Sequence, residues 1–296
     1  MFSIIVCSIR PNEAEALRQN IAATIGDVPF EMIAYDNRGT GKGIAEVYNE
    51  CAARAKYDLL CFAHEDIEFR SEGWGRDIAS KLEEVGTGVI GFAGSTYKSA
   101  YPTGWLCTRR WGVRMHYVQG RGEGEHLFDD NPDKSYYSEV VSLDGLCLFV
   151  HRRVWEEVRF DDELLRGFHC YDVDFTIATT IAGYRNYVCH TQLVKHRSSG
   201  AYSYDWYHTN LAMHEKWSDF LPLYVAMPSV RECEDLERRA EAEALRKVMQ
   251  HGMFEVCSWG DIVDYIARYP LKFVSYKLFA QTIKYRLRAL LKGVKR

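Results

Sequence analysis

The chain has 296 residues, of which 47% are hydrophobic and 26% charged, as expected for one large globular domain or a domain with an extension. Its net charge of −4 excludes a general nucleic-acid binder, which would need a strongly basic surface. The chain has nine cysteines but no CxxC pair, a basic leader is lacking, and no apolar stretch approaches the roughly 20 residues that cross a bilayer. We therefore expect reduced thiols and a cytoplasmic protein.

The first hundred residues alternate between strand and helix patterns. Apolar runs predict the strands, and apolar side chains at helical spacing predict the helices between them. The predicted strands are Phe2–Cys7, Phe30–Tyr35, Leu59–Ala63 and Gly88–Ala93, and helices are expected to begin near Pro11, Ile44 and Trp74. This alternation predicts an α/β fold with a parallel sheet covered by helices on both faces.

The segment from Ser95 to Glu139 is aromatic and irregular, and its polar part, Gly120–Ser138, predicts a mobile loop. The elements predicted after it are a strand at Leu146–Val150, a helix at Asp172–Ala182, a strand at Tyr187–Cys189 and an exposed, highly charged helix from Val230. We expect one domain over residues 1–225 and a charged helical extension over residues 226–296.

Acidic residues follow the predicted strands. Asp36 ends the second strand, and Glu65 and Asp66 follow the third in the run His64-Glu65-Asp66. Ligands of open α/β sheets bind just beyond the carboxyl ends of the strands, and carboxylates there suit a divalent cation that bridges phosphates. A solvated acidic turn is the alternative.

A second group of titratable residues lies later in the chain. Asp172 and Asp174 stand at the predicted start of a helix, where they either cap free backbone N–H groups or act in chemistry. His196 follows about twenty residues later, as a ligand or as a structural histidine. Arg109, Arg110 and Arg114 are candidate phosphate contacts, with solvated strand arginines as the alternative.

In their order along the chain, these motifs resemble the family-2 type glycosyltransferases of the GT-A fold, in a bacterial group that carries His-Glu-Asp in place of the usual DxD motif. The resemblance runs from Phe2 to about Trp217. It rests on Ser3–Ser8, Asp36, Lys42–Asn49, His64-Glu65-Asp66, Asp144-Gly145, Phe160–Glu163, Tyr171–Phe175, Ala182-Gly183-Tyr184 and His196.

The resemblance implies a GT-A fold with a mixed, mostly parallel sheet flanked by helices, and a metal-dependent inverting glycosyltransferase. The donor would be a nucleotide-diphosphate sugar, with a UDP-sugar as the expected one, and the acceptor a hydroxyl of a glycan or lipid-linked glycan in surface polysaccharide synthesis. Asp66 and His196 would hold Mn²⁺ or Mg²⁺, and Asp172 would be the general base, with Asp174 as its rival. The residues that would contact the nucleotide or the donor sugar are Ser8, Arg10, Asp36, Glu65 and Asp144.

Three other functions are alternatives to this one. A P-loop enzyme is disfavoured, because Asp36 stands where the first glycine belongs and Gly43 follows Lys42. A sugar-nucleotide nucleotidyltransferase would need a glycine-rich, basic loop after the first strand, and Ser8-Ile9-Arg10-Pro11-Asn12 is not one. A non-catalytic sugar- or partner-binding protein of the same fold stays open.

The C-terminal segment is basic and apolar. Residues 271–296 contain eight lysines and arginines and no acid. This composition favours an amphipathic helix on an anionic membrane, which would make the protein peripheral on the inner face of the cytoplasmic membrane. The alternative is a helix packed on the protein with its basic side chains in water.

Overall fold

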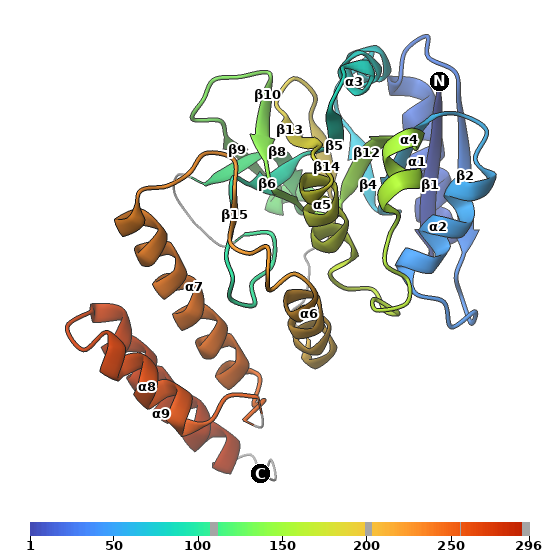
Figure 1. Cartoon of the computed structure of the whole chain (residues 1–296). Coiled ribbons are helices and arrows are strands. Elements are labelled where there is room, and N and C mark those ends of the chain that lie inside the picture. The colour runs from blue at the N-terminus through green and yellow to red at the C-terminus, as the bar shows by residue number, and fades with distance from the viewer. Residues whose placement is uncertain (107–111, 199–202, 255, 292–296) are drawn as a thin grey trace.

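The computed structural model describes residues 1–106, 112–198, 203–254 and 256–291 (Figure 1). Its centre is a mixed sheet of seven strands. In spatial order they are β10 (Tyr137–Val140), β13 (Arg185–Cys189), β5 (Thr87–Gly91), β12 (Cys147–His151), β3 (Leu59–Ala63), β1 (Phe2–Ser8) and β2 (Phe30–Asp36). Strand β1 is parallel to β2 and β3, and β5 is parallel to β13, whereas β12 runs antiparallel between β3 and β5.

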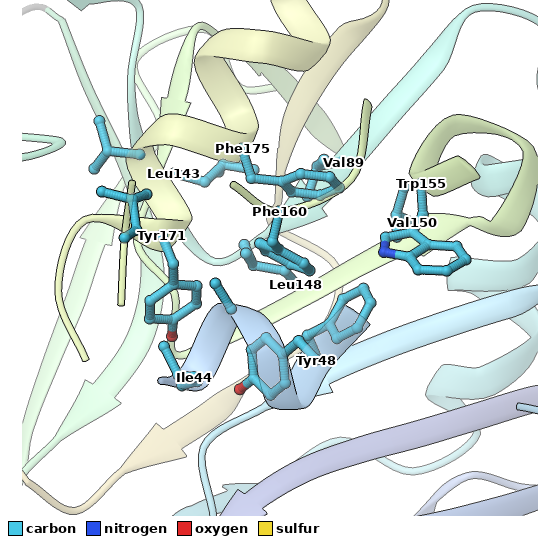
Figure 2. Close-up of a cluster of buried hydrophobic side chains, with 14 of the residues drawn as sticks. Ile44, Tyr48, Val89, Leu143, Leu148, Val150, Trp155, Phe160, Tyr171 and Phe175 are labelled. Atoms are coloured by element: carbon cyan, nitrogen blue, oxygen red, sulfur yellow. The ribbon is translucent and has the colours of Figure 1, made fainter. Parts of the chain in front are cut away.

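Helices cover both faces of this sheet, as the alternating pattern predicts. In chain order the helices are α1 (Pro11–Thr24), α2 (Ile44–Arg54), α3 (Trp74–Glu83), α4 (Arg152–Val158), α5 (Tyr171–Ile181), α6 (Tyr204–Lys216), α7 (Val230–Gln250), α8 (Trp259–Arg268) and α9 (Phe273–Leu291). Side chains alternate along β1, so that Ile4 packs with α1 and α3 while Ile5 packs with α2, α4 and α5. In Figure 2, Tyr48 of α2 and Tyr171 of α5 lie in the second of these cores; their ring centroids are 5.6 Å apart.

A smaller sheet lies beside the central one. Its strands are β11 (Ser142–Leu143), β6 (Ala93–Ser95), β8 (Val113–Gln119), β14 (Val194–His196) and β4 (Ile67–Phe69), with β9 (His126–Asp130) paired to β8. The predicted strand Gly88–Ala93 is therefore divided: β5 belongs to the central sheet and β6 to the smaller one. Within β6, Gly94 permits the close pairing with β11, because a Cβ there would lie 2.6 Å from the carbonyl oxygen of Ser142.

The prediction of a loop over Gly120–Ser138 was wrong. After the short 3₁₀ helix η1 (Gly122–Gly124), β9 pairs antiparallel with β8, and β10 begins at Tyr137. The rings of Tyr117 and Phe128 stack across the hairpin with centroids 5.2 Å apart. Backbone pairing, this aromatic contact and polar side-chain contacts such as that of His116 with Asp129 hold the hairpin, so its polar composition concealed it.

The helices α7, α8 and α9 form the C-terminal extension, next to α6 (Figure 1). They share a core that includes Met249, Tyr265 and Leu278, and Tyr207 of α6 packs into it. Another pairing, between β7 (Tyr97–Lys98) and β15 (Leu223–Tyr224), lies just before α7. The charged helix α7 is less exposed than its composition predicts, because Glu241 is buried and pairs with Arg268 of α8. Among the described residues, no helix is long and apolar enough to span a bilayer.

Candidate active site

The candidate site lies at the carboxyl ends of β1 and β3. Glu65, which follows β3, closes the turn between β1 and α1. One of its oxygens accepts hydrogen bonds from Ser8 Oγ at 2.7 Å and from the backbone N–H groups of Ile9 and Arg10, and the other accepts from Arg10 Nε at 2.8 Å. Glu65 is 6% exposed, so these bonds satisfy a buried carboxylate. Through them Glu65 holds Ser8 and Arg10 in place beside Asp66.

Asp66 is buried beside His196, the last residue of β14. Asp66 Oδ1 lies 3.5 Å from His196 Nε2, and Asp66 Oδ2 lies 3.7 Å from the Arg10 guanidinium. Burial raises the pKa of Asp66, but hydrogen bonds from His196 and Ser198 outweigh it and hold the pKa below its usual range. Asp66 is therefore a carboxylate at neutral pH.

His64 completes this group, although the sequence pattern pointed to Asp66 and His196 alone. Its Nδ1 lies 3.3 Å from His196 Nε2, and its Nε2 lies 2.8 Å from the hydroxyl of Tyr171. That hydroxyl donates its proton to the carbonyl oxygen of Gly145, so its oxygen accepts from His64 Nε2–H. Gln119 Oε1 similarly lies 3.4 Å from His196 Nδ1. These outer partners use the far nitrogen of each ring, so His64 Nδ1 and His196 Nε2 are the two nitrogens that lie near each other and near Asp66.

The three residues His64, Asp66 and His196 are suited to hold a metal ion. One ligand atom from each lies within 4.8 Å of the other two. Asp66 Oδ2 is buried and has no hydrogen-bond partner among the described residues, as expected of an atom that a cation would contact. Burial and repulsion from His196 lower the pKa of His64 to about 4, so this ring is neutral and able to ligate at physiological pH.

Asp172 follows Tyr171 in the first turn of α5. The helix begins after Cys170, whose backbone is left-handed with φ 64°. Asp172 Oδ2 accepts a 2.8 Å hydrogen bond from the backbone N–H of Gly145. A Cβ on Gly145 would lie 2.4 Å from the Tyr171 hydroxyl and 2.9 Å from the Cβ of Asp172, so the contact requires glycine. This close approach accounts for Asp144-Gly145 in the sequence.

Burial, with the negative charge of Asp144 as the second cause, raises the pKa of Asp172 to about 7. A carboxylate with such a pKa can accept a proton near neutral pH and is suited to general base catalysis. Asp144 follows β11, and its Oδ1 accepts a hydrogen bond from the N–H of Leu146. The structure thus places Asp144 and Asp172 within electrostatic reach of each other.

Asp174, two residues further along α5, is in a different environment. Both of its oxygens lie 2.9 Å from Lys216 Nζ, and Trp217 Nε1 donates to one of them at 2.7 Å. The side chain is 1% exposed. Asp174 thus joins α5 to the end of α6.

The remaining candidates with a described side chain are engaged in ion pairs of their own. Asp36, at the end of β2, is exposed, and hydrogen bonds from Arg38 lower its pKa to about 2. Arg114 is buried and pairs with Asp133 at 2.7 Å. Arg109 and Arg110 lie outside the described residues.

Known proteins resemble this chain in sequence and in structure. The model of the family described as "Glycosyltransferase like family" matches residues 3–214. The streptomycin biosynthesis protein StrF of Streptomyces griseus is 27% identical over 180 residues. That match covers 60% of this chain and about 60% of the length of StrF.

Among solved structures, residues 1–349 of S. aureus TarS give a TM-score of 0.52 at 14% identity, covering 99% of this chain and 91% of that one. The same TarS segment in complex with UDP-GlcNAc gives a TM-score of 0.50 at 15% identity, with 99% and 92% covered. At this identity the likeness shows the fold, which is GT-A, with a central mixed sheet flanked by helices. Because the family model spans most of the chain, the protein belongs to this glycosyltransferase-like family.

Proposed function

We propose that this protein is a metal-dependent, inverting glycosyltransferase that uses a UDP-sugar. The observation that carries the proposal is a pair of groups linked through Tyr171 and its neighbour in α5. His64, which contacts the Tyr171 hydroxyl, forms with Asp66 and His196 a group suited to a cation. Asp172, the next residue of α5, is a carboxylate with a pKa of about 7. A glycosyl transfer needs both: neutralisation of the leaving diphosphate and a base for the acceptor hydroxyl.

The donor would bind against Asp66 and His196, with His64 beside them. A divalent cation held there would stabilise the charge that develops on the leaving diphosphate as a Lewis acid. Two imidazoles favour Mn²⁺ over Mg²⁺, which takes mainly oxygen ligands. Arg10, beside Asp66 and held by Glu65, adds a positive charge for the diphosphate. UDP is the expected nucleotide because TarS, which shares the fold, has been solved with UDP and with UDP-GlcNAc.

Other residues would position the donor. We propose that Asp36 accepts hydrogen bonds from the nucleotide base after its exposed partner Arg38 moves aside. Ser8, whose hydroxyl is committed to Glu65, would act by shaping the turn below the nucleotide. Asp144, near Asp172, would contact the donor sugar or the acceptor hydroxyl.

Asp172 would take the proton of the acceptor hydroxyl. Direct displacement by that hydroxyl inverts the anomeric carbon and needs one base, on the face opposite the leaving group. Asp174 is less suited, because Lys216 and Trp217 occupy its oxygens. A positioned base of this kind contributes a factor of about 10² to 10⁴ in rate.

The test is calorimetric titration with UDP, GDP and CDP, each with and without Mn²⁺, into wild type, Asp66→Ala and Asp172→Asn. We expect tight UDP binding that needs Mn²⁺, loss of this binding in Asp66→Ala, and its retention in Asp172→Asn. Turnover with a UDP-sugar should fall at least about 10²-fold in Asp172→Asn. Near-wild-type turnover in that variant would refute the base, and absence of metal-linked binding to all three nucleotides would favour a non-catalytic relative.

The acceptor is proposed to be a glycan or lipid-linked glycan of a surface polysaccharide, reached at the cytoplasmic membrane. Helix α9 supports this proposal, because its surface divides into three stripes, each about a third of its circumference. One stripe, which includes Leu278 and Thr282, is buried towards α7 and α8. The two others are exposed: an apolar stripe of Tyr276, Phe279, Ile283, Leu287 and Leu290, and a basic stripe of Lys277, Lys284 and Arg288. Adjacent exposed apolar and basic stripes are complementary to an anionic lipid surface.

Vesicle co-sedimentation tests this surface. We expect wild type to bind vesicles that contain anionic phosphatidylglycerol and not pure phosphatidylcholine, and truncation after Pro270 to abolish binding while UDP binding persists. The double variant Phe279→Ser, Ile283→Ser should bind vesicles at least about 10-fold more weakly and keep the fold. Val85→Ser, at an exposed apolar position outside α9, is the matched control. Equal vesicle binding by the double variant and wild type would refute the membrane proposal.

A further inference from the structure

A second group of metal-ligating side chains lies away from the candidate active site. It consists of His116, Asp129 and His190, and one ligand atom from each lies within 4.8 Å of the other two. His116 Nδ1 is 3.1 Å from Asp129 Oδ1. The sequence offers no motif for this group, because its members come from three separate segments.

The β8–β9 hairpin and the end of β13 bring the three residues together. His116 and Asp129 are direct partners in the antiparallel register of β8 and β9. His190 follows β13, and its backbone N–H donates to the carbonyl oxygen of Tyr136 just before β10. Side chains alternate along a strand, so His116 points to the opposite face of β8 from Gln119, whose side chain contacts His196. The second group is therefore separate from the group around Asp66.

His190 has an unsatisfied nitrogen. Its Nε2 lies 3.1 Å from Ser138 Oγ, which in turn lies 2.9 Å from Ser135 Oγ. Its Nδ1 is buried and has no hydrogen-bond partner within the described part of the chain. A histidine that ligates a metal usually donates a hydrogen bond from one ring nitrogen to an outer partner and binds the metal through the other nitrogen. In His190 the outer partner is the Ser138 hydroxyl, and Nδ1 is the nitrogen that could bind a metal. A surface ion pair of His116 with Asp129 would leave this buried nitrogen unexplained.

The charges near His190 leave room for a cation. The nearby Arg114 is neutralised by its ion pair with Asp133. Asp129, exposed over 54% of its side chain, gives the group a negative charge and an opening to solvent.

We propose that His116, Asp129 and His190 form a second metal site, which binds a borderline transition-metal cation of the Zn²⁺ class. Two imidazoles and one carboxylate are a ligand set of Zn²⁺ proteins, with a fourth position for water. Mg²⁺ and Ca²⁺ are disfavoured because they take oxygen ligands. A bound cation joins β9 to the segment after β13. It thereby stiffens β8, the strand whose Gln119 holds His196.

The substitution His190→Gln tests the site most directly. The amide of glutamine reaches about as far as Nε2 and keeps a donor for Ser138, but it removes the nitrogen at Nδ1. Zn²⁺ is titrated into wild type and variants, with bound metal counted by elemental analysis after gel filtration. Co²⁺ absorption reports on the coordination geometry. We expect His190→Gln to lose one equivalent of bound Zn²⁺ relative to wild type, together with the Zn²⁺-induced rise in Tm that depends on this site.

Matched variants separate this site from the other metal group and from general effects. Asp129→Asn should also lose one equivalent, whereas Asp130→Asn and His126→Gln, on the same strand, should keep the wild-type stoichiometry. Asp66→Ala should leave the Zn²⁺ equivalent that depends on His190 in place, which makes this test independent of the proposed transferase activity. The proposal is overturned if His190→Gln and Asp129→Asn bind as much Zn²⁺ as wild type, or if Asp130→Asn and His126→Gln lose as much as they do.

Discussion

The hydroxyl of Tyr171 lies 2.8 Å from Nε2 of His64 and donates to the carbonyl oxygen of Gly145. The first residue of α5 therefore orients the imidazole that follows β3. The next residue of the helix, Asp172, accepts a hydrogen bond from the N–H of the same Gly145. One tyrosine and one glycine thus link the proposed metal group to the proposed base.

Removal of the Tyr171 hydroxyl should weaken metal binding. Tyr171→Phe keeps the packed ring but leaves His64 Nε2 without its acceptor, so the ring loses its tautomer and orientation. Loss of such an outer partner costs about 10- to 100-fold in metal affinity. Calorimetric titration with Mn²⁺ measures the change, and Tyr184→Phe, at a part-exposed tyrosine after α5, is the control. Unchanged affinity in Tyr171→Phe would show that this hydrogen bond does not orient His64.

The rate of sugar transfer should depend on the ionisation of Asp172. The base is active as a carboxylate, and its pKa is raised to about 7. We expect kcat/KM to rise tenfold per pH unit below about pH 7 and to level off above it. Asp144→Asn removes the second cause of the raised pKa, so the midpoint should move to lower pH. A profile already level from pH 5 in wild type, or an unshifted midpoint in Asp144→Asn, would contradict this assignment.

Ionisation of Asp172 should make the wild-type protein less stable as the pH rises. A raised pKa in the folded state favours the protonated carboxyl, so its contribution to stability is complete below about pH 4 and is lost as pH rises through about 7. Because each unit of pKa shift corresponds to about 1.4 kcal/mol, Asp172→Asn should be more stable than wild type at pH 8, by on the order of a few kcal/mol. Urea unfolding at pH 5 and pH 8 measures this difference. Asp36→Asn, where the pKa is lowered, should show no such gain, and a gain there equal to that of Asp172→Asn would argue for a general charge effect.

Asp174 should matter for stability. Asp174→Ala leaves the indole N–H of Trp217 without its acceptor and removes the buried partner of Lys216, and loss of one partner of a buried pair costs about 3 to 5 kcal/mol. Asp161→Ala removes the more exposed acid that Lys216 also contacts, and should cost about 1 kcal/mol or less. Urea unfolding compares the two. A stable Asp174→Ala variant that binds UDP but transfers no sugar would make Asp174 the base in place of Asp172.

Much of the fold was predictable, because the spacing of apolar residues along the chain reflects the period of the helix or strand that they form. The run Leu59–Ala63 is β3 to the residue, and the helix predicted at Asp172–Ala182 is α5 shifted by one. The division between β5 and β6 was not visible in the pattern, since a continuous apolar run carries no sign that the chain changes sheet. The β8–β9 hairpin was missed for the opposite reason: its backbone pairs although polar side chains interrupt its apolar ones.

The sequence predicted those site residues that follow strands, because the carboxyl ends of neighbouring strands meet at one edge of the sheet. Asp66 and His196 were chosen from order along the chain, and the structure brings them together, while their role as metal ligands stays a prediction. Glu65 was expected at the donor, and the structure shows its oxygens used within the turn after β1. From the sequence, Asp172 was expected to be the base, with Asp174 as its rival. Their difference comes from Lys216 on α6, more than forty residues later.

By itself, the sequence determined the elements and the edge of the sheet at which the polar residues gather. Periodicity and strand ends are local properties, and they are set by the residues of one segment. The tertiary structure alone decided which oxygens and nitrogens remain available, because hydrogen bonding uses up donors and acceptors between segments far apart in the chain. Glu65 and Asp174 have their oxygens occupied, whereas Asp66 Oδ2 and Nδ1 of His190 have no hydrogen-bond partner among the described residues.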